Sequence, residues 1–553
     1  MSLLNWGLRL VGGPPWHALE RAAGDPRRAQ EKFLLTLIHR ARDTAFGADH
    51  GFDRIHTVDD YRQLVPLTDY ERLRPYVDRL RAGESTALTA EAPHALALTS
   101  GTTGEPKFLP VTRELEQAGS RLTRAWLYRA LVDHPAFLNG RLLAIVSPDV
   151  EGRTIEGMSY GSASGRLYRT NAWLIRRRYA LPPAVLAIKD FDAKYYAMAR
   201  LGVAQDVSFL GTPNPSTILR LVETADACKE DIIRDVRNGG LSSRFDIPSE
   251  VRDERLPATR PNLTRARELE RMVAEHRALR PSEYWPHLQL IGCWKGGSVG
   301  VQLSKLEPWF SAELPVRDLG YLSTEAHVTV PFQDEGSAGL LAVGSNFYEF
   351  IREDEIDESM PTTLLCDELE QGATYYMVLT TSGGLYRYDI NDIVRVTGFH
   401  GRTPLLEFVR KGRDMTSIGG EKLHIAQVVE AMRRAQEKSR LSAAHYRAVA
   451  CAESNRYELL IECEGETPRR EALAVFLRAA DSELCALNVE YRQKRESRRL
   501  DPPVLHVMQA GWHDRQYRKR VAQGARDTQF KSALLTSDLS VDDLGEISLT
   551  VDL

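Results

Sequence analysis

Short apolar runs alternate with segments of helical periodicity along roughly the first 400 residues, a pattern typical of layered α/β proteins. The apolar runs predict strands at residues 95–98, 141–147, 207–210, 288–291, 314–319, 339–343, 375–380, 393–396 and 405–409. The helical periodicity predicts helices at residues 17–46, 113–132, 215–235, 262–277 and 302–311. The charged stretch 238–262 predicts a surface excursion. We therefore expect one large α/β domain over residues 1–409.

Residues 410–414, Arg-Lys-Gly-Arg-Asp, form a charged break after the last of these strands. A compact α+β pattern follows, with helices predicted at 424–438 and 469–488 and strands at 446–452, 457–463 and 504–508. We expect a hinge at 410–414 and a small C-terminal domain over residues 415–553. An ordinary exposed turn is the alternative interpretation of the break.

Composition narrows the class of protein. The net charge of −4, from 72 basic and 76 acidic residues, gives no bulk field that would attract nucleic acid or an anionic membrane. Six cysteines without a Cys-x-x-Cys pair argue against zinc and against a disulfide framework. No stretch approaches the ~20 apolar residues of a spanning helix. We expect a cytoplasmic protein with no nucleic-acid partner, no membrane span and no obligate protein partner.

Hydroxyl groups and glycines crowd behind the first predicted strand. The candidate phosphate-binding residues there are Thr99, Ser100, Gly101, Thr102, Thr103, Gly104 and Lys107. Hydroxyls donate hydrogen bonds, glycines let the backbone approach an anion closely, and the lysine adds positive charge. The order of residues differs from the Gly-x-x-x-x-Gly-Lys-Ser/Thr pattern of the P-loop NTPases. The pattern predicts a phosphate-binding loop of another kind, with a plain polar turn as the alternative.

This loop resembles the phosphate-binding loop of the adenylate-forming enzymes, the superfamily of acyl-CoA ligases, luciferases and peptide-synthetase adenylation domains. Gly320–Glu325 is similar to the superfamily's Tyr-x-Ser-Thr-Glu signature, and Gly384–Asp392 is similar to its ribose-binding segment. Further stretches are similar to the auxin-conjugating acyl acid–amido synthetases, the Gretchen Hagen family, at residues 65–71, 75–79, 211–216, 292–297, 384–400, 524–526 and 529–531. Because plant members usually differ from this chain at Lys107, it looks like a bacterial-type member.

The resemblance covers about residues 60–535. It implies a large N-terminal adenylate-forming domain of layered α/β subdomains, with a small, mobile α+β C-terminal domain. It also implies ATP and Mg²⁺ as cofactors. Glu325 would hold Mg²⁺ and serve catalysis, since hard cations bridge carboxylate and phosphate oxygens. Lys531 would approach the reacting carboxylate and the α-phosphate as a second catalytic residue, a task that suits a point cation.

Other ATP contacts follow from the same resemblance. Asp392 would accept hydrogen bonds from both ribose hydroxyls, with Asp389 as its rival. The remaining candidates are Gly296, Gly297, Tyr321, Ser323, Thr324 and Arg410. The serine and threonine would reach the phosphate or purine side, and the arginine would meet ribose or phosphate from the hinge. The two glycines would let adenine lie against bare backbone, although tight turns use glycine pairs as well.

The expected activity is that of an ATP-dependent ligase, which adenylates a carboxylic acid and transfers the acyl group to an amine such as an amino acid, releasing AMP and pyrophosphate. The alternatives are a thiol acceptor, as in an acyl-CoA ligase, or a nucleotide-sensing protein without catalysis. Candidate bases for the second step are His327, His400 and Glu421, although core or surface positions are commoner roles for such residues. Candidate acyl-pocket residues, although a place in the plain core is the commoner role for each, are Leu122, Trp126, Tyr160 and Trp173.

Overall fold

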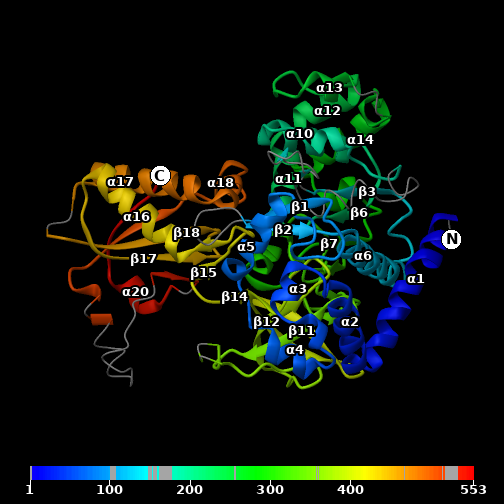
Figure 1. Cartoon of the computed structure of the whole chain (residues 1–553). Coiled ribbons are helices and arrows are strands. Elements are labelled where there is room, and N and C mark those ends of the chain that lie inside the picture. The colour runs from blue at the N-terminus through cyan, green and yellow to red at the C-terminus, as the bar shows by residue number, and fades with distance from the viewer. Residues whose placement is uncertain are drawn as a thin grey trace. The chain divides into compact units, whose positions relative to one another are not determined.

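The computed structural model describes residues 3–99, 107–146, 152–153, 159–160, 177–253, 257–356, 358, 360–465, 468–513, 515–516, 534–537 and 539–553 (Figure 1). The chain divides into two compact units, a large one comprising Met1–Thr99 with Lys107–Val409 and a small one comprising Arg410–Leu553. Within the described residues, every helix is too short or too polar to cross a membrane.

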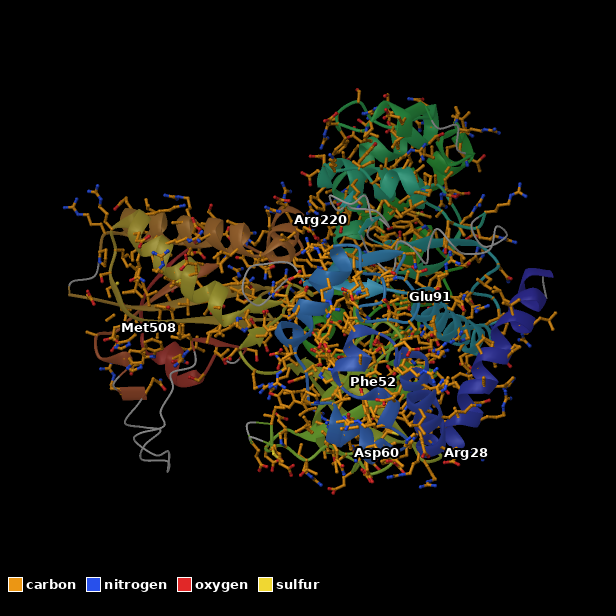
Figure 2. The ribbon with its side chains drawn as sticks, in the orientation of Figure 1. Arg28, Phe52, Asp60, Glu91, Arg220 and Met508 are labelled. Atoms are coloured by element: carbon orange, nitrogen blue, oxygen red, sulfur yellow. The ribbon has the colours of Figure 1, made fainter. Side chains whose placement is uncertain are left out.

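The large unit begins with helices that pack on its core. They are α1 (Leu3–Gly24), α2 (Pro26–Ala41), α3 (Ala45–Asp49), α4 (Val58–Leu64) and α5 (Tyr70–Arg81). The single helix predicted at 17–46 is wrong. The side chain of Asp25 accepts a hydrogen bond from the Arg28 amide, and Pro26 takes the first helical position, so α2 starts anew there. Phe52, labelled in Figure 2, lies buried beside this region with its ring 5.1 Å from that of Tyr386.

A first sheet has the order β2–β1–β5–β4. Its strands are β1 (Ala95–Thr99), β2 (Lys107–Val111), β4 (Gly152–Arg153) and β5 (Ser159–Tyr160). Strands β1 and β2 are antiparallel, and Thr99 is the direct partner of Lys107. The two ends of the hydroxyl-rich segment are therefore neighbours in the sheet. The predicted helix at 113–132 is confirmed as α6 (Arg113–Asp133), which Thr112 caps by accepting from the Leu115 amide.

A second, parallel sheet has the order β3–β6–β7–β8. Its strands are β3 (Arg141–Ala144), β6 (Val207–Gly211), β7 (Leu290–Gly292) and β8 (Val316–Arg317). Because parallel strands end at the same edge, the segments after β6, β7 and β8 lie close together. Three segments that resemble family motifs at separate places in the sequence therefore lie at this edge: Thr212–Ser216, Cys293–Gly297 and Tyr321–Glu325.

The helices of this region depart from prediction in two places. They are α9 (Pro183–Leu186), α10 (Phe191–Val203), α11 (Pro215–Ala227), α12 (Lys229–Asn238), α13 (Ser249–Asp253), α14 (Leu263–His276), α15 (Pro281–Tyr284) and the 3₁₀ helices η2 (Pro257–Thr259) and η3 (Gly297–Leu306). The helix predicted at 215–235 is broken at Cys228, which ends α11 and starts α12. The helix predicted at 302–311 is instead η3, which starts at the left-handed Gly297.

A third sheet, with the order β11–β12–β13–β14–β10–β9, completes the large unit. Its strands are β9 (Thr329–Val330), β10 (Gly339–Leu341), β11 (Phe347–Arg352), β12 (Thr374–Thr380), β13 (Tyr388–His400) and β14 (Thr403–Lys411). The strand predicted at 393–396 is the middle of the much longer β13. Its first residues, Tyr388–Asp392, form the end of the segment Gly384–Asp392 that is similar to a ribose-binding segment, so Asp392 lies within a strand.

The small unit is built around the sheet β20–β17–β18–β19–β21. Its elements are β15 (Met415–Thr416), β16 (Leu423–His424), α16 (Ile425–Ser439), β17 (Ala443–Cys451), β18 (Arg456–Cys463), α17 (Arg470–Leu487), α18 (Val489–Glu496), β19 (Val504–Met508), β20 (Leu535–Thr536), α20 (Val541–Gly545) and β21 (Ile547–Val551). Leu459 packs with α16 and α17, whereas its neighbour Leu460 packs with Trp512 on the other face. The expected α+β pattern is present, and the elements that were not predicted are α18, α20, β15, β16, β20 and β21.

Candidate functional site

The centre of the candidate site is a contact between two segments far apart in sequence. Tyr321 follows β8, and its hydroxyl donates a hydrogen bond to the carboxylate of Asp392 on β13. Burial and the nearby Asp392 charge hold the pKa of Tyr321 well above its usual range, so the hydroxyl keeps its proton. The Tyr321 ring also lies 5.6 Å from the ring of Phe408. This contact joins the Tyr-Leu-Ser-Thr-Glu segment to the ribose-binding segment.

Glu325 stands at a tight turn two residues after Ser323. The Ser323 amide donates to the Ala326 carbonyl at 3.0 Å, and the Val328 amide donates to the Tyr321 carbonyl at 2.8 Å. Glu325 is only 6% exposed. Burial, followed by the charge of Glu325, holds the pKa of Tyr388 well above its usual range. The carboxylate of Glu325 therefore lies within electrostatic reach of the start of β13.

Asp318 fastens the two segments that leave β7 and β8. Its carboxylate accepts hydrogen bonds from the amides of Lys295 and Gly320, each at 2.6 Å. The Trp294 indole donates to the Gly320 carbonyl at 3.0 Å. Burial raises the pKa of Asp318 to about 6, against the opposing effect of these amides. Sequence reasoning missed Asp318, although a carboxylate directly after a strand and two residues before a glycine–tyrosine pair could have indicated it.

The Gly296–Gly297 pair packs against β14. Gly297 has φ of +62°, and a Cβ there would lie 2.9 Å from the Phe408 ring. A Cβ at Gly296 would lie 3.2 Å from the Phe408 carbonyl oxygen. Turn geometry and close approach therefore suffice to explain glycine at both positions. A contact of this pair with adenine stays a prediction.

The two rival carboxylates of the ribose-binding segment have different surroundings. Asp389 accepts a hydrogen bond from the Asn391 amide at 2.7 Å, which closes a local turn. Asn391 has φ of +56°, a conformation that asparagine tolerates better than most residues. Asp392 is 2% exposed and faces the Tyr321 hydroxyl. Which of the two carboxylates accepts the ribose hydroxyls stays a prediction.

The other predicted ATP contacts are only partly described. Lys107 opens β2, with its ammonium 5.5 Å from the centre of the Tyr70 ring. Arg410 is exposed and lies near the end of β14, where the small unit begins. The predicted residues that lie outside the described part of the chain are Ser100, Gly101, Thr102, Thr103, Gly104, Trp173 and Lys531, together with the side chains of Thr99 and Tyr160. Their roles stay predictions.

The candidate bases occupy packed positions. Burial lowers the pKa of His327 to about 4, so its ring is neutral, and its Nε2 lies 3.1 Å from the Thr329 carbonyl oxygen. The His400 ring packs against Phe332 at 5.4 Å. Glu421, buried in the small unit, accepts from the Ile418 and Gly419 amides at 2.6 and 2.8 Å. Such local bonding is typical of structural residues.

The candidate acyl-pocket residues that can be described lie in the core. Leu122 and Trp126 are both 4% exposed and belong to one hydrophobic cluster. The Trp126 indole donates to the Asp318 carbonyl at 2.8 Å. Helix α6 therefore packs directly behind the Asp318 clamp, by which we mean Asp318 and the amides of Lys295 and Gly320 that it binds, and Trp126 makes the contact.

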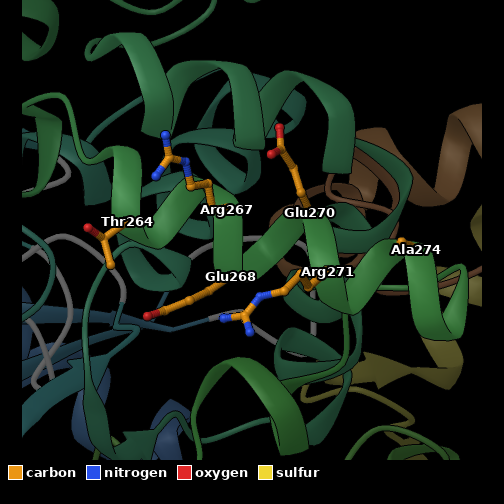
Figure 3. Close-up of a pocket in the computed structure, with 6 residues that line it drawn as sticks. All are labelled: Thr264, Arg267, Glu268, Glu270, Arg271 and Ala274. Atoms are coloured by element: carbon orange, nitrogen blue, oxygen red, sulfur yellow. The ribbon is translucent and has the colours of Figure 1, made fainter.

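A surface hollow of about 550 Å³ lies on α14 (Figure 3). It is lined by Thr264, Arg267, Glu268, Glu270, Arg271 and Ala274. All six residues come from one helix, and two of the charges form ion pairs, Glu270 with Arg237 and Glu268 with Arg265. An open, charged face of this kind is typical of a solvent-exposed helix, and none of its residues belongs to the candidate site.

Known proteins resemble the chain along most of its length. The sequence profile of the GH3 family N-terminal domain matches residues 16–316, that of the GH3 family central domain residues 339–411, and that of the GH3 family C-terminal domain residues 426–540. Indole-3-acetic acid-amido synthetase GH3.10 of Arabidopsis thaliana is 27% identical, with 88% of each chain covered. Jasmonoyl–L-amino acid synthetase JAR4 of Nicotiana attenuata is 25% identical, with 92% of this chain and 91% of the relative covered.

The fold is shared with a solved structure of AtGH3.15 acyl acid amido synthetase in complex with 2,4-DB. The two are 19% identical, with a TM-score of 0.68 over 98% of each chain. The resemblance noted in the sequence is thus confirmed at the level of the family, while a bacterial type stays a prediction. Because the N-terminal profile alone spans more than half of the 553 residues, the chain belongs to the GH3 family and is an ATP-using acyl acid–amido synthetase.

Proposed function

We propose that this chain joins a small or aromatic carboxylic acid to an amino acid through an acyl-adenylate. The contact between Tyr321 and Asp392 carries the proposal, since it brings together two segments with the chemistry of a nucleotide site. A carboxylate oxygen attacks the α-phosphorus of ATP, and the bond to pyrophosphate breaks. The amine nitrogen then attacks the acyl carbon and loses a proton, and AMP leaves. The relatives' names, of which one specifies an amido synthetase and the other an L-amino acid acceptor, support an amine over a thiol.

Nucleotide binding divides between the two segments in this proposal. The Asp392 carboxylate accepts from the ribose hydroxyls, because its oxygens offer paired acceptors. Ser323 and Thr324 lie toward the phosphates or purine. Lys107 and the hydroxyl-rich residues before it hold the phosphate groups. Arg410 meets the ribose or phosphate from the small unit.

Mg²⁺ is proposed as the metal that accompanies ATP, with Glu325 as its protein ligand. A buried carboxylate is a suitable hard oxygen donor. In the described part of the chain, no cluster of three or more His, Cys, Asp or Glu side chains could hold a metal by itself. This fits Mg²⁺, which commonly uses one or two carboxylates together with substrate phosphates and water. When bound, the ion would neutralise phosphate charge.

The small unit is proposed to turn about residues 410–414, which would bring Lys531 to the reacting carboxylate and α-phosphate. The division of the chain between Val409 and Arg410 supports a hinge at this place. Asp414, within the proposed hinge, has φ of +56°. We also propose a reducing compartment, the cytoplasm, because all six cysteines are free thiols and three of them are buried.

The test is pyrophosphate exchange with a panel of carboxylic acids, followed by mass analysis of the products formed with amino acids or coenzyme A. We expect exchange that depends on both the acid and Mg²⁺, and an amide product with an amino acid. Asp392→Ala should lose exchange while keeping the wild-type circular dichroism spectrum. Formation of a coenzyme A thioester without amide would contradict the proposal, as would absence of exchange with every acid in a folded protein that binds ATP.

A further inference from the structure

A buried charged network lies beside the ribose-binding segment. Nε and Nη2 of Arg387 donate to the two carboxylate oxygens of Glu349 at 2.9 and 3.0 Å, in a bidentate arrangement. Glu349 also accepts from Arg62 at 3.1 Å and from the Thr363 hydroxyl at 2.7 Å. Glu349 is 1% exposed and Arg387 is 6% exposed. The network belongs to the large unit and lies outside the residues assigned to substrates.

The network holds a backbone conformation that the residue would otherwise avoid. Arg387 has φ of +45°, which costs energy for a side chain with a Cβ and persists only where the surroundings enforce it. Its Nη1 donates to the carbonyls of Arg62 and Val65 at 2.9 and 2.8 Å. Its amide donates to the Thr380 hydroxyl at 3.0 Å. The side chain and backbone of Arg387 are thus anchored at the same time.

Thr68 holds the same turn from the other side. Its amide donates to the Arg387 carbonyl at 2.8 Å, and its carbonyl accepts from the Asp389 amide at 2.8 Å. Its hydroxyl donates to the Tyr386 carbonyl at 2.6 Å. Residues 386–389 are therefore fixed immediately before β13 turns toward Asp392.

Asp392 itself lies on an irregular stretch of β13. The pairing with β12 shifts register between Tyr376, which faces Ile393, and Val378, which faces Asp389. Residues 390–392 therefore stand opposite a single residue of β12, as in a β-bulge, which redirects side chains. The direction of a bulged side chain depends on how firmly the strand is held on both sides. The β12 ladder holds one side, and the contacts of Thr68 and Arg387 hold the other.

We infer that Thr68, Glu349 and Arg387 are positioning residues that aim the Asp392 carboxylate at the ribose hydroxyls, and so make the enzyme prefer ATP over 2′-deoxyATP. The inference rests on the proposed role of Asp392. It extends the site to residues that touch no substrate, and it gives the 65–71 segment a function in nucleotide selection.

The test compares kcat/KM for ATP and for 2′-deoxyATP in acid-dependent pyrophosphate exchange. Thr68→Val removes only the hydroxyl bond to Tyr386, and Glu349→Gln removes the charge that pairs with Arg387. Thr403→Val is the matched control, since Thr403 is fully buried and its hydroxyl donates to the Ala23 carbonyl at 2.9 Å, away from the ribose-binding segment. We expect the wild type and Thr403→Val to share one preference for ATP.

In Thr68→Val this preference should fall by about tenfold, the scale of one weakened hydrogen bond to a charged group. A merely structural role would lower both kcat/KM values equally and leave their ratio unchanged. If Glu349→Gln does not fold, Thr68→Val decides alone. An active wild type whose Thr68→Val variant keeps the wild-type ratio overturns the inference and leaves the proposed function standing. A folded wild type without exchange overturns both.

Discussion

Tyr321→Phe is the most direct test of the contact at the centre of the site. The substitution removes one oxygen atom and keeps the ring that packs on Phe408. It removes the hydroxyl that donates a hydrogen bond to the carboxylate of Asp392, a residue that is only 2% exposed. The backbone should stay in place, because the Tyr321 amide donates independently to the Thr329 hydroxyl at 2.9 Å. Any loss of stability or of ATP affinity in this variant therefore reports on the hydrogen bond between the phenol and the carboxylate.

The size of the defect follows from the charge of the acceptor. A hydrogen bond to a charged group contributes about 1.5–3 kcal/mol, more than a bond between neutral groups. We expect the free energy of unfolding of the large unit to fall by that amount. The KM for ATP should rise by about tenfold, because about 1.4 kcal/mol corresponds to a factor of ten. Since the pKa of Tyr321 lies well above its usual range, both effects should be the same at about pH 6 and about pH 9.

A double-mutant cycle with Asp392→Asn measures the contact itself. Urea unfolding followed by tryptophan fluorescence gives the free energies of the wild type, the two single variants and the double variant. We expect a coupling free energy of about 1.5–3 kcal/mol. A coupling below about 0.5 kcal/mol, the usual scatter for independent sites, would show that the two groups do not interact and would refute the reasoning.

Three further predictions concern other residues of the site. Glu325→Gln keeps the shape but removes the charge proposed to hold Mg²⁺, so pyrophosphate exchange should fall at least ~10²-fold while the fold survives, and a near-normal rate would make Glu325 structural. Lys531→Ala should cripple adenylation in single-turnover assays but spare attack on a preformed acyl-adenylate, and an equal loss in both steps would contradict the two-conformation hypothesis. Burial raises the pKa of Asp318 from 3.8 to about 6, so the stability that its protonated form contributes is complete below about pH 4 and is lost as the pH rises through 6. The free energy of unfolding of the wild type, minus that of Asp318→Asn, should therefore fall by up to about 3 kcal/mol between pH 4 and 7.

The sequence predicted well those features whose cause is local. An apolar run predicted β1, and a segment of helical periodicity predicted α6, with errors of a residue or two at the ends. The two segments that contain Tyr321 and Asp392 could also be recognised, because each carries its chemistry within about nine consecutive residues. Their meeting in space is consistent with that recognition.

Features that depend on tertiary contacts could not be predicted in the same way. The helix break at Asp25–Pro26 does not depend on tertiary contacts, because the capping aspartate and the proline are local signals. The single helix predicted at 17–46 was therefore an error of interpretation. The contact of Asp318 with Lys295 and the Arg387 turn are different, since nothing near Asp318 or Arg387 indicates these distant partners. Arg387 finds Glu349 38 residues away and Val65 322 residues away. A left-handed arginine is also an unfavourable local choice, which only those distant partners make stable.

The 65–71 segment shows how such distant contacts can leave a recognisable motif. Val65 offers its carbonyl to Arg387, Thr68 pairs with residues 386–389, and the side chain of Asp69 caps α5 by accepting from the Arg72 amide at 2.9 Å. The Tyr70 hydroxyl accepts from the amide of Phe108, the residue after Lys107, at 2.8 Å.

One short segment therefore contacts both the strand that follows the hydroxyl-rich loop and the strand that carries Asp392. We expect its length to affect the distance between these two strands, and hence between the proposed phosphate and ribose contacts of one nucleotide. An insertion between Thr68 and Tyr70 should accordingly weaken ATP binding even though no residue of the segment is proposed to touch ATP.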